Sequence, residues 1–345
     1  MSDRKTLSEE MVAAAGGALA SDKAKVRSDA ELYERATIEA GGAATDACGT
    51  DTDGAVACET PASHEAIEAE EEAFEREGVE PIIFLDNIEV TFKTRTGSLL
   101  HPNLVHAVRG LTLKLWPGET IGIVGESGCG KSTTANVMCG LQSPTSGRVF
   151  FKGKDVTHRT AADRRVIGRV ISVVFQDPAT ALNARMSVRE QLLDPMIVHK
   201  VGTKEERERR VHDLIGMVGL PQSALEALPG QLSGGQRQRV AIARALALKP
   251  DAIIADEPTS ALDVSVRAQI LNLLMDLKKE LGLAMVFISH DIQTVRYISD
   301  RIIVMNAGRA VERGTAEQVF NDPQDSYTRL LLGAAPSLLH PELGK

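Results

Sequence analysis

GESGCGKST, residues 125–133, follows the apolar stretch TIGIV and decides the fold. These residues satisfy the pattern G-x-x-x-x-G-K-[ST], which binds phosphate when it joins a strand to a helix. Gly125, Gly128 and Gly130 let the backbone curl, so that successive N–H groups point at phosphate oxygens. The helix that follows adds its positive end. The stretch therefore predicts a nucleotide-binding loop at the end of a strand in an α/β sheet.

Two side chains of this loop have predicted chemical roles. Lys131 is expected to reach the β- and γ-phosphates, and the Ser132 hydroxyl is expected to ligate Mg²⁺. No base for Cys129 can be identified, so we interpret it as an incidental loop residue rather than a nucleophile. The predicted ATP-binding loop also includes Glu126, Ser127 and Thr133.

The stretch AIIADEP, residues 252–258, predicts a second part of the site. A buried apolar strand here ends in two carboxylates, and the carboxyl ends of parallel strands form the binding crevice of an α/β sheet. Asp256 is expected to hold Mg²⁺ directly or through water, and Glu257 to polarise the attacking water as a general base. Alone, the pair would indicate only a strand that runs into a polar loop; beside a phosphate loop it indicates catalysis.

The stretch LSGGQRQR, residues 232–239, begins a predicted helix 20 residues before AIIADE. A serine followed by two glycines at a helix start is suited to binding an anion. The plainer interpretation is a serine N-cap with a glycine-rich turn. The spacing favours an anion-binding helix start that includes Ser233, Gly234, Gly235 and Gln236.

Short apolar strands and helical patterns alternate along the chain from residue 121 onward. This alternation predicts an α/β fold with a mainly parallel sheet covered by helices. Helical patterns alone occupy about residues 177–240, which predicts a helical subdomain inserted into the core. The expected strands are VISVVF, AIIAD, AMVFIS and RIIVM, besides IIFLDNIEVTF and the two strands of LTLKLWPGETIGIVG.

With these motifs in place, the sequence resembles the ABC-type ATPases. The resemblance implies their fold: a P-loop nucleotide-binding domain with an antiparallel β subdomain and a helical insertion. Gln176 matches the glutamine loop, which touches Mg²⁺ or the attacking water and faces a transmembrane partner; His290 in FISHD matches the switch histidine that contacts the γ-phosphate. Asp263 in SALD matches the loop that links the two sites of a dimer. Phe92 occupies the position of the aromatic that stacks on adenine, with core packing as its alternative.

The same resemblance implies a head-to-tail dimer. Each ATP would lie between the phosphate loop of one domain and Ser233, Gly234 and Gly235 of the other. ATP binding would close the dimer, and hydrolysis would open it. Because the chain carries one copy of each motif, a second chain is required, and a heterodimer is favoured over a homodimer.

Finer features of residues 82–335 resemble the oligopeptide and dipeptide permease ATPases, in particular the second (F-type) of their paired ATPases. The stretches that carry this resemblance are VTFKTRTG, HAVRGLTL, VFQDPATALNARMSV, SHDIQTVRYISDRIIVM and NDPQDSYTRLLLGAAP. It implies peptide import with two integral membrane subunits, an external substrate-binding protein and a sister ATPase. The chain would then be peripheral, on the cytoplasmic side of the plasma membrane. The chain departs from the family in two places. Asp325, Ser326 and Tyr327 stand where the family usually has His-Pro-Tyr. The Cys-rich end of several relatives is missing, so no iron–sulfur cluster is expected.

Two alternative functions stay open. The same importer architecture would serve another cargo, such as nickel, an opine, a sugar or an antimicrobial peptide, because an ATPase subunit does not touch the cargo. A soluble ABC ATPase of DNA repair, chromosome organisation or translation is the other alternative. Such proteins carry paired cassettes, zinc insertions or coiled coils, and the 3% aromatic content offers no stacking platform for bases, so no nucleic-acid partner is expected.

The net charge of −8 is a sum over two unlike parts. Residues 1–80 carry 20 acidic and 7 basic side chains, hence −13, whereas residues 81–345 carry 27 and 32, hence +5. The first part is expected to be a mostly disordered acidic extension with a short helix in SHEAIEAEEEAFEREG, or else a docking arm. The ATPase domain is expected over 81–320, and a C-terminal extension over 321–345.

The composition of the chain argues against several other classes of protein. With 43% hydrophobic and 25% charged residues, the chain is ordinary globular material outside its N-terminal part. No apolar run approaches the ~18 residues of a membrane span, and the start lacks the apolar region of a secretory signal. The four cysteines fit neither a disulfide framework nor a clustered metal site, which indicates a reduced, cytosolic chain.

Overall fold

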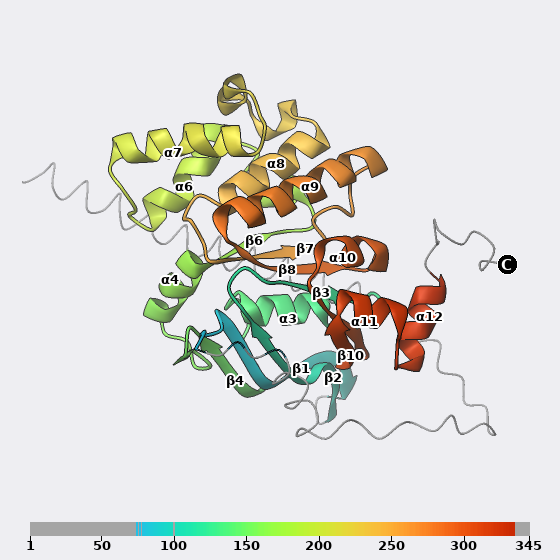
Figure 1. Ribbon diagram of the computed structural model, residues 1–345. Helices are drawn as coiled ribbons and strands as arrows, with labels where there is room; N and C mark the ends of the chain where they lie inside the picture. The colour runs from blue at the N-terminus through green and yellow to red at the C-terminus, as the bar shows by residue number, and fades with distance from the viewer. Residues whose placement is uncertain (1–73, 75, 77, 99–100, 335–345) are drawn as a thin grey trace, which may run out of the picture. The chain divides into compact units, whose positions relative to one another are not determined.

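A computed structural model describes residues 74, 76, 78–98 and 101–334 (Figure 1). The chain separates into two units, residues 1–60 and 61–345, and every described residue belongs to the second. Most of the predicted acidic extension, including the first part of its expected helix, lies outside the described residues, as does the chain beyond residue 334.

The larger sheet has six strands in the order β10-β9-β3-β8-β7-β6. All neighbours pair in parallel except β9 and β10, which are antiparallel, and this confirms the predicted mainly parallel sheet. Successive residues of β7 face opposite sides, as strand geometry requires: Ile253 and Ala255 enter one apolar core, and Ile254 enters the other. The bounds are β3 Thr120–Val124, β6 Ile171–Val174, β7 Ala252–Asp256, β8 Ala284–Ser289, β9 Arg301–Asn306 and β10 Arg309–Thr315.

The smaller sheet is antiparallel, with strand order β2-β1-β4-β5. Its long hairpin joins β1 (Ile83–Ser98) to β2 (His101–Leu115), and β4 (Ser146–Phe151) and β5 (Lys154–Asp155) follow. Pro117 and Gly118 separate β2 from β3 as predicted, but the two strands belong to different sheets. The antiparallel subdomain expected from the resemblance is therefore present.

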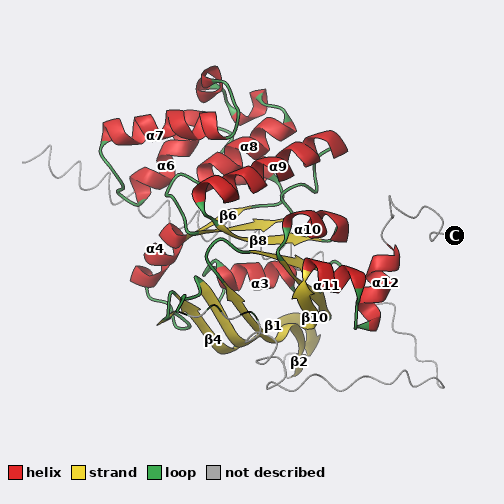
Figure 2. Ribbon diagram, in the orientation of Figure 1, coloured by secondary structure: helices red, strands yellow, loops and turns green. Residues whose placement is uncertain are grey.

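Helix α3 (Lys131–Met138) lies between the two sheets (Figure 2). Its residues Val137 and Met138 are fully buried in the core that both sheets share. The opposite face of the larger sheet is covered by helices that include α9 (Val264–Leu281) and α10 (Ile292–Ile298) (Figure 2). The described chain also contains α4 (Ala161–Val170), α11 (Ala316–Asn321) and α12 (Ser326–Ala334). No described helix combines the length and the apolar character that a membrane crossing requires.

A helical segment separates β6 from β7, and within the described chain it contains no strand. It consists of α5 (Pro178–Ala181), α6 (Val188–Val198), α7 (Lys204–Met217), α8 (Gly234–Ala245) and the 3₁₀ turns η2 (Gln222–Glu226) and η3 (Pro229–Gln231). Capping boxes at Ser187, Thr203 and Ser233 start the three longer helices, because each side chain accepts the N–H three residues on.

The strand register brings distant parts of the sequence to one edge. Val124 of β3 pairs with Ser289 of β8 and Val304 of β9. Ala255 of β7 pairs with Val174 of β6 and Phe287 of β8. The loops that follow β3, β6, β7 and β8 therefore leave the sheet at the same edge, and they carry the predicted site.

Candidate active site

The phosphate loop is wedged between neighbouring backbone segments. Gly125 has φ +155°, and a Cβ there would lie 2.1 Å from the carbonyl oxygen of Met305. Gly130 has φ +106°, and a Cβ there would lie 2.2 Å from the carbonyl oxygen of Ala107. Only glycine fits both places, for steric as well as conformational reasons. The loop is therefore held in shape by the two sheets around it.

The Lys131 ammonium lies against its own loop. It donates to the carbonyl oxygens of Gly125 and Glu126, each at 2.8 Å, and lies 3.8 Å from the Cys129 sulfur. Lys131 is only 6% exposed. Burial raises the pKa of the Cys129 thiol in spite of this cation, which agrees with the interpretation of Cys129 as unreactive.

Asp256, at the end of β7, fits the predicted magnesium site. It is 7% exposed, and its Oδ1 has no hydrogen-bond partner among the described residues. Desolvation raises its pKa to about 6; a hydrogen bond with Ser132 and the charge of Lys131 oppose that rise, and the charge of Glu257 adds to it. A buried carboxylate oxygen beside a hydroxyl is the donor set that Mg²⁺ prefers, since water and phosphate complete its shell. The residues present therefore fit the ion.

Gln176, Glu257 and His290 meet at the sheet edge. The Gln176 amide donates to Oε2 of Glu257 at 3.2 Å, and Nδ1 of His290 lies 3.1 Å from Oε1 of the same carboxylate. The Glu257 side chain is 18% exposed, and that of His290 is 60% exposed. The three side chains predicted to be catalytic thus form one cluster around a half-buried carboxylate that still faces solvent.

The backbone of Glu257 is left-handed, with φ +46°. Its N–H donates to the carbonyl oxygen of Ile288, and its own carbonyl oxygen accepts from the N–H and the hydroxyl of Ser260. A glutamate in this region is strained by about 1–2 kcal/mol. These bonds hold the residue there and turn its side chain towards Gln176 and His290.

Two of the predicted dimer contacts are helix caps in the single chain. The Ser233 hydroxyl accepts the N–H of Gln236, and Oε1 of Gln236 accepts the N–H of Ser233. Asp263 accepts from the Val266 N–H and the Ser265 hydroxyl, and these bonds lower the pKa of its carboxyl. Among the described residues, Ser233 has its hydrogen bonds with Gln236 and none with the phosphate loop of the same chain.

Phe92 lies on β1, where it pairs with Val105, and its side chain is 36% exposed. Among the described residues it does not belong to either buried core. Its exposure is compatible with stacking on a base, and the adenine role remains a prediction.

Tyr327 is a contact of the phosphate loop that the motifs do not reveal. Its hydroxyl, on α12, accepts the backbone N–H of Glu126 at 3.1 Å, 201 residues away in the sequence. The only sequence signal is the tyrosine of DSYT, which the resemblance to peptide permease ATPases aligns with His-Pro-Tyr.

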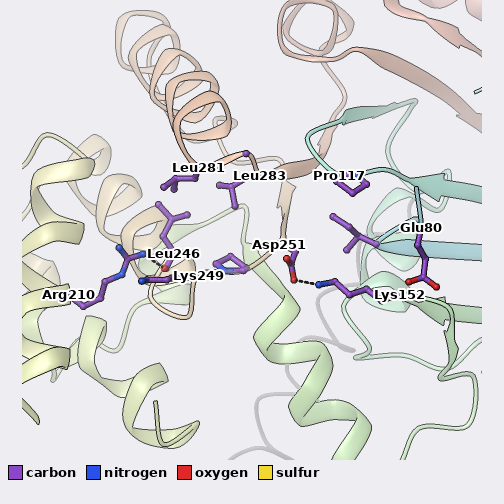
Figure 3. A pocket seen from close by; sticks show the side chains of 12 residues that line it. Glu80, Pro117, Lys152, Arg210, Leu246, Lys249, Asp251, Leu281 and Leu283 are labelled. Carbon is purple, nitrogen blue, oxygen red and sulfur yellow. Dashed lines mark hydrogen bonds and ion pairs between the residues drawn. The ribbon is translucent and has the colours of Figure 1, made fainter. Parts of the chain in front are cut away.

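A cavity of about 580 Å³ lies elsewhere, at the opposite end of the sheet. Pro117, Asp251 and Leu283, which line it, precede β3, β7 and β8 (Figure 3). Lys152 and Asp251 form a 2.9 Å ion pair at its wall (Figure 3). The phosphate loop follows the other end of β3, so this cavity is separate from the predicted nucleotide site.

Comparison with known proteins agrees with this geometry. Residues 108–260 match the family model described as "ABC transporter". The chain is 42% identical over 259 residues to the dipeptide transport ATP-binding protein DppF of Escherichia coli, covering 75% of this chain and 78% of that protein. It is also 42% identical to the oligopeptide transport ATP-binding protein OppF of Lactococcus lactis, covering 74% and 81% of the two chains.

Solved structures with a similar fold are also ATP-binding cassettes of ABC transporters. The fold matches the ATP-binding cassette MJ0796, solved as a dimer in a post-hydrolysis state bound to ADP and Pi, with a TM-score of 0.61 and 33% identity. That match covers 68% of this chain and 98% of the cassette. A second match, with a TM-score of 0.62 and 30% identity, is cbiO1 of Clostridium perfringens, part of an ABC transporter complex. The chain therefore belongs to the ABC transporter ATP-binding proteins, in the group of the dipeptide and oligopeptide transport ATPases.

Proposed function

We propose that the chain hydrolyses ATP to energise the uptake of oligopeptides or dipeptides through a membrane complex. The observation that supports this most strongly is the cluster of Gln176, Glu257 and His290 beside the phosphate loop. It places one carboxylate between an amide and an imidazole at the sheet edge where the γ-phosphate of a bound ATP would lie.

Each side chain of the site has a distinct proposed role. The loop N–H groups and Lys131 bind the phosphates, with Lys131 leaving its loop carbonyls for the β- and γ-oxygens. Ser132, Asp256 and Gln176 would hold Mg²⁺, which would supply positive charge to offset that of the phosphates. Glu257 orients the attacking water and accepts its proton, so that ADP leaves as the new P–O bond forms. His290 contacts the γ-phosphate and, with Gln176, orients the Glu257 carboxylate. Phe92 stacks on adenine.

A second ATPase subunit completes the site in this proposal. Ser233, Gly234, Gly235 and Gln236 of one subunit would contact the ATP held by the other, and Asp263 would link the two sites. The start of α8, with the backbone N–H groups of Gly234 and Gly235, would supply the anion contact in the partner's site. A heterodimer with a sister ATPase is favoured over a homodimer.

The proposed assembly includes two integral membrane subunits and an external substrate-binding protein, with this chain peripheral on the cytoplasmic side. The relatives that support a peptide cargo are named dipeptide and oligopeptide transport proteins. Import of another cargo by the same architecture is the second candidate, because no residue of the described site would touch the cargo.

Purification of the tagged full-length chain from detergent-solubilised membranes tests this proposal. We expect integral membrane subunits and a second ATPase to co-purify. The complex in lipid vesicles, with ATP supplied on the side of the ATPases, should take up a labelled tripeptide, and the Lys131→Ala complex should not. Uptake of nickel or a sugar but no peptide would show that the cargo is not a peptide, and the transport function would stand. Recovery of ribosomes or DNA without membrane subunits would overturn the transport function.

A further inference from the structure

The C-terminal helix reaches the phosphate loop through one side chain. The Tyr327 hydroxyl accepts the N–H of Glu126 at 3.1 Å, while the Glu126 carbonyl oxygen accepts from the Lys131 ammonium at 2.8 Å. The ring packs at the edge of a buried core, together with Leu331 and Leu332. Burial raises the pKa of Tyr327 above its ordinary value, so the hydroxyl is neutral at physiological pH. Tyr327 and Lys131 thus hold the two sides of one loop residue.

The position of Tyr327 is set by contacts on both sides of it. Oδ1 of Asp325 accepts the Tyr327 N–H at 2.8 Å and so begins α12. Glu312, on β10, accepts the N–H groups of Gln324 and Asp325 at 2.8 and 3.1 Å. Arg329 donates to the carbonyl oxygen of Gln324 at 2.6 Å. These hydrogen bonds hold the C-terminal extension against β10, and they therefore fix the position from which the Tyr327 hydroxyl contacts the phosphate loop.

These two contacts respond differently to a nucleotide. Lys131 is the only one of the pair that carries a charge, and a phosphate draws its ammonium away from the carbonyl oxygens of Gly125 and Glu126. The Tyr327 hydroxyl is neutral and would remain on the Glu126 N–H. After Lys131 had moved, Glu126 would keep two hydrogen bonds, one to Tyr327 and one from the Cys129 N–H at 3.3 Å, and only the first comes from outside the loop.

We propose that Tyr327 is a positioning residue for the phosphate loop, through which the C-terminal extension raises the affinity of the site for ATP. This inference rests on the nucleotide site proposed above, and it assigns a part of that site to a segment outside the nucleotide-binding motifs. A neutral hydrogen bond of this kind contributes about 1 kcal/mol, which is about a fivefold change in affinity.

The test compares Tyr327→Phe with wild type in the full-length chain, purified with its membrane subunits. We expect the KM for ATP and the Kd for the non-hydrolysable analogue AMPPNP to rise about fivefold, with kcat at saturating ATP unchanged within twofold. Tyr297→Phe is the matched control: its hydroxyl donates to Asn272 on the surface, so both constants should stay at wild-type values. Asp325→Ala should raise the Kd in the wild-type background and add little to Tyr327→Phe, because both changes act through one contact.

Two results would overturn the inference. One is a Tyr327→Phe complex whose Kd and KM equal those of wild type. The other is a lower kcat and Tm with an unchanged Kd, which is the pattern of a general structural role. If the wild-type complex bound no nucleotide, the proposed function would fail together with this inference.

Discussion

The Glu257 carboxylate and the His290 imidazole lie 3.1 Å apart, at the ends of neighbouring strands β7 and β8. Gln176 holds the other oxygen of the same carboxylate at 3.2 Å. Both oxygens of the carboxylate are thus oriented, and 18% of the Glu257 side chain stays exposed, so a water molecule can reach it, as the proposed general base needs.

Glu257→Gln should abolish turnover without abolishing ATP binding. The amide keeps the size and one acceptor oxygen of the side chain but cannot take a proton, so kcat should fall at least ~100-fold. ATP hydrolysis and AMPPNP binding by the purified complex measure the two effects. Glu280→Gln, the same change on an exposed part of α9, is the control. Equal rates for Glu257→Gln and wild type would remove Glu257 from the mechanism.

His290→Ala should lower kcat about 100-fold, because it removes the imidazole proposed to stabilise the negative charge of the γ-phosphate during its transfer. His212→Ala provides the control, because His212 is exposed on α7 and pairs with Gln222 far along the chain from the catalytic loops. Its complex should turn over at the wild-type rate. A His290→Ala complex that hydrolyses ATP normally would assign the histidine a structural role only.

Asp256→Asn should stabilise the nucleotide-free chain at neutral pH. The folded-state pKa of Asp256 is raised to about 6 from 3.8, so its stabilising contribution is fully present below pH 3.8 and is lost as pH rises through 6. The ionised form then lowers stability by about 3 kcal/mol, which the amide avoids. Denaturant unfolding should therefore favour the variant at pH 8 and show no difference near pH 4. A wild-type advantage at pH 8 would contradict the assigned pKa shift.

The same substitution should remove the magnesium effect. ATP with Mg²⁺ should raise the Tm of wild type by several degrees more than ATP with EDTA, and the Asp256→Asn variant should show no such difference. The wild-type response should weaken below about pH 6, because a protonated carboxyl is a poor ligand. Asp276→Asn, an exposed change on α9, should keep the wild-type response.

Gly234→Asp should separate folding from hydrolysis. A Cβ at Gly234 would meet only the Leu262 methyl at 3.7 Å, and a carboxylate at the start of α8 suits the helix dipole, so Tm should not fall. The added charge would repel the γ-phosphate that the partner subunit holds, so ATP hydrolysis should drop at least ~100-fold. Gly216→Asp adds the same charge on α7, where a Cβ meets open space, and its complex should hydrolyse ATP normally. Normal hydrolysis by Gly234→Asp would argue against a contact across the dimer.

Local pattern made part of the site predictable. The phosphate loop and the carboxylates of β7 each follow an apolar strand, and parallel strands end at one edge, so their meeting follows from the pattern. Gln176 and His290 were expected only from the resemblance to the ABC-type ATPases, because a lone glutamine or histidine after a strand carries no such signal. The split of β2 and β3 between two sheets did not follow, because alternation identifies strands and not their neighbours. The contact of Tyr327 with Glu126 could not be predicted either, because the two residues are 201 positions apart in the sequence. It depends on how Asp325 and Glu312 orient α12.

The left-handed backbone of Glu257 sets stability against activity at one position. Glycine would relax that residue and, by the usual scale for such conformations, make the chain more stable by about 1 kcal/mol. It would also delete the carboxylate that Gln176 and His290 both contact. Glu257→Gly should therefore raise the melting temperature of the chain and at the same time leave a protein that binds nucleotide without hydrolysing it.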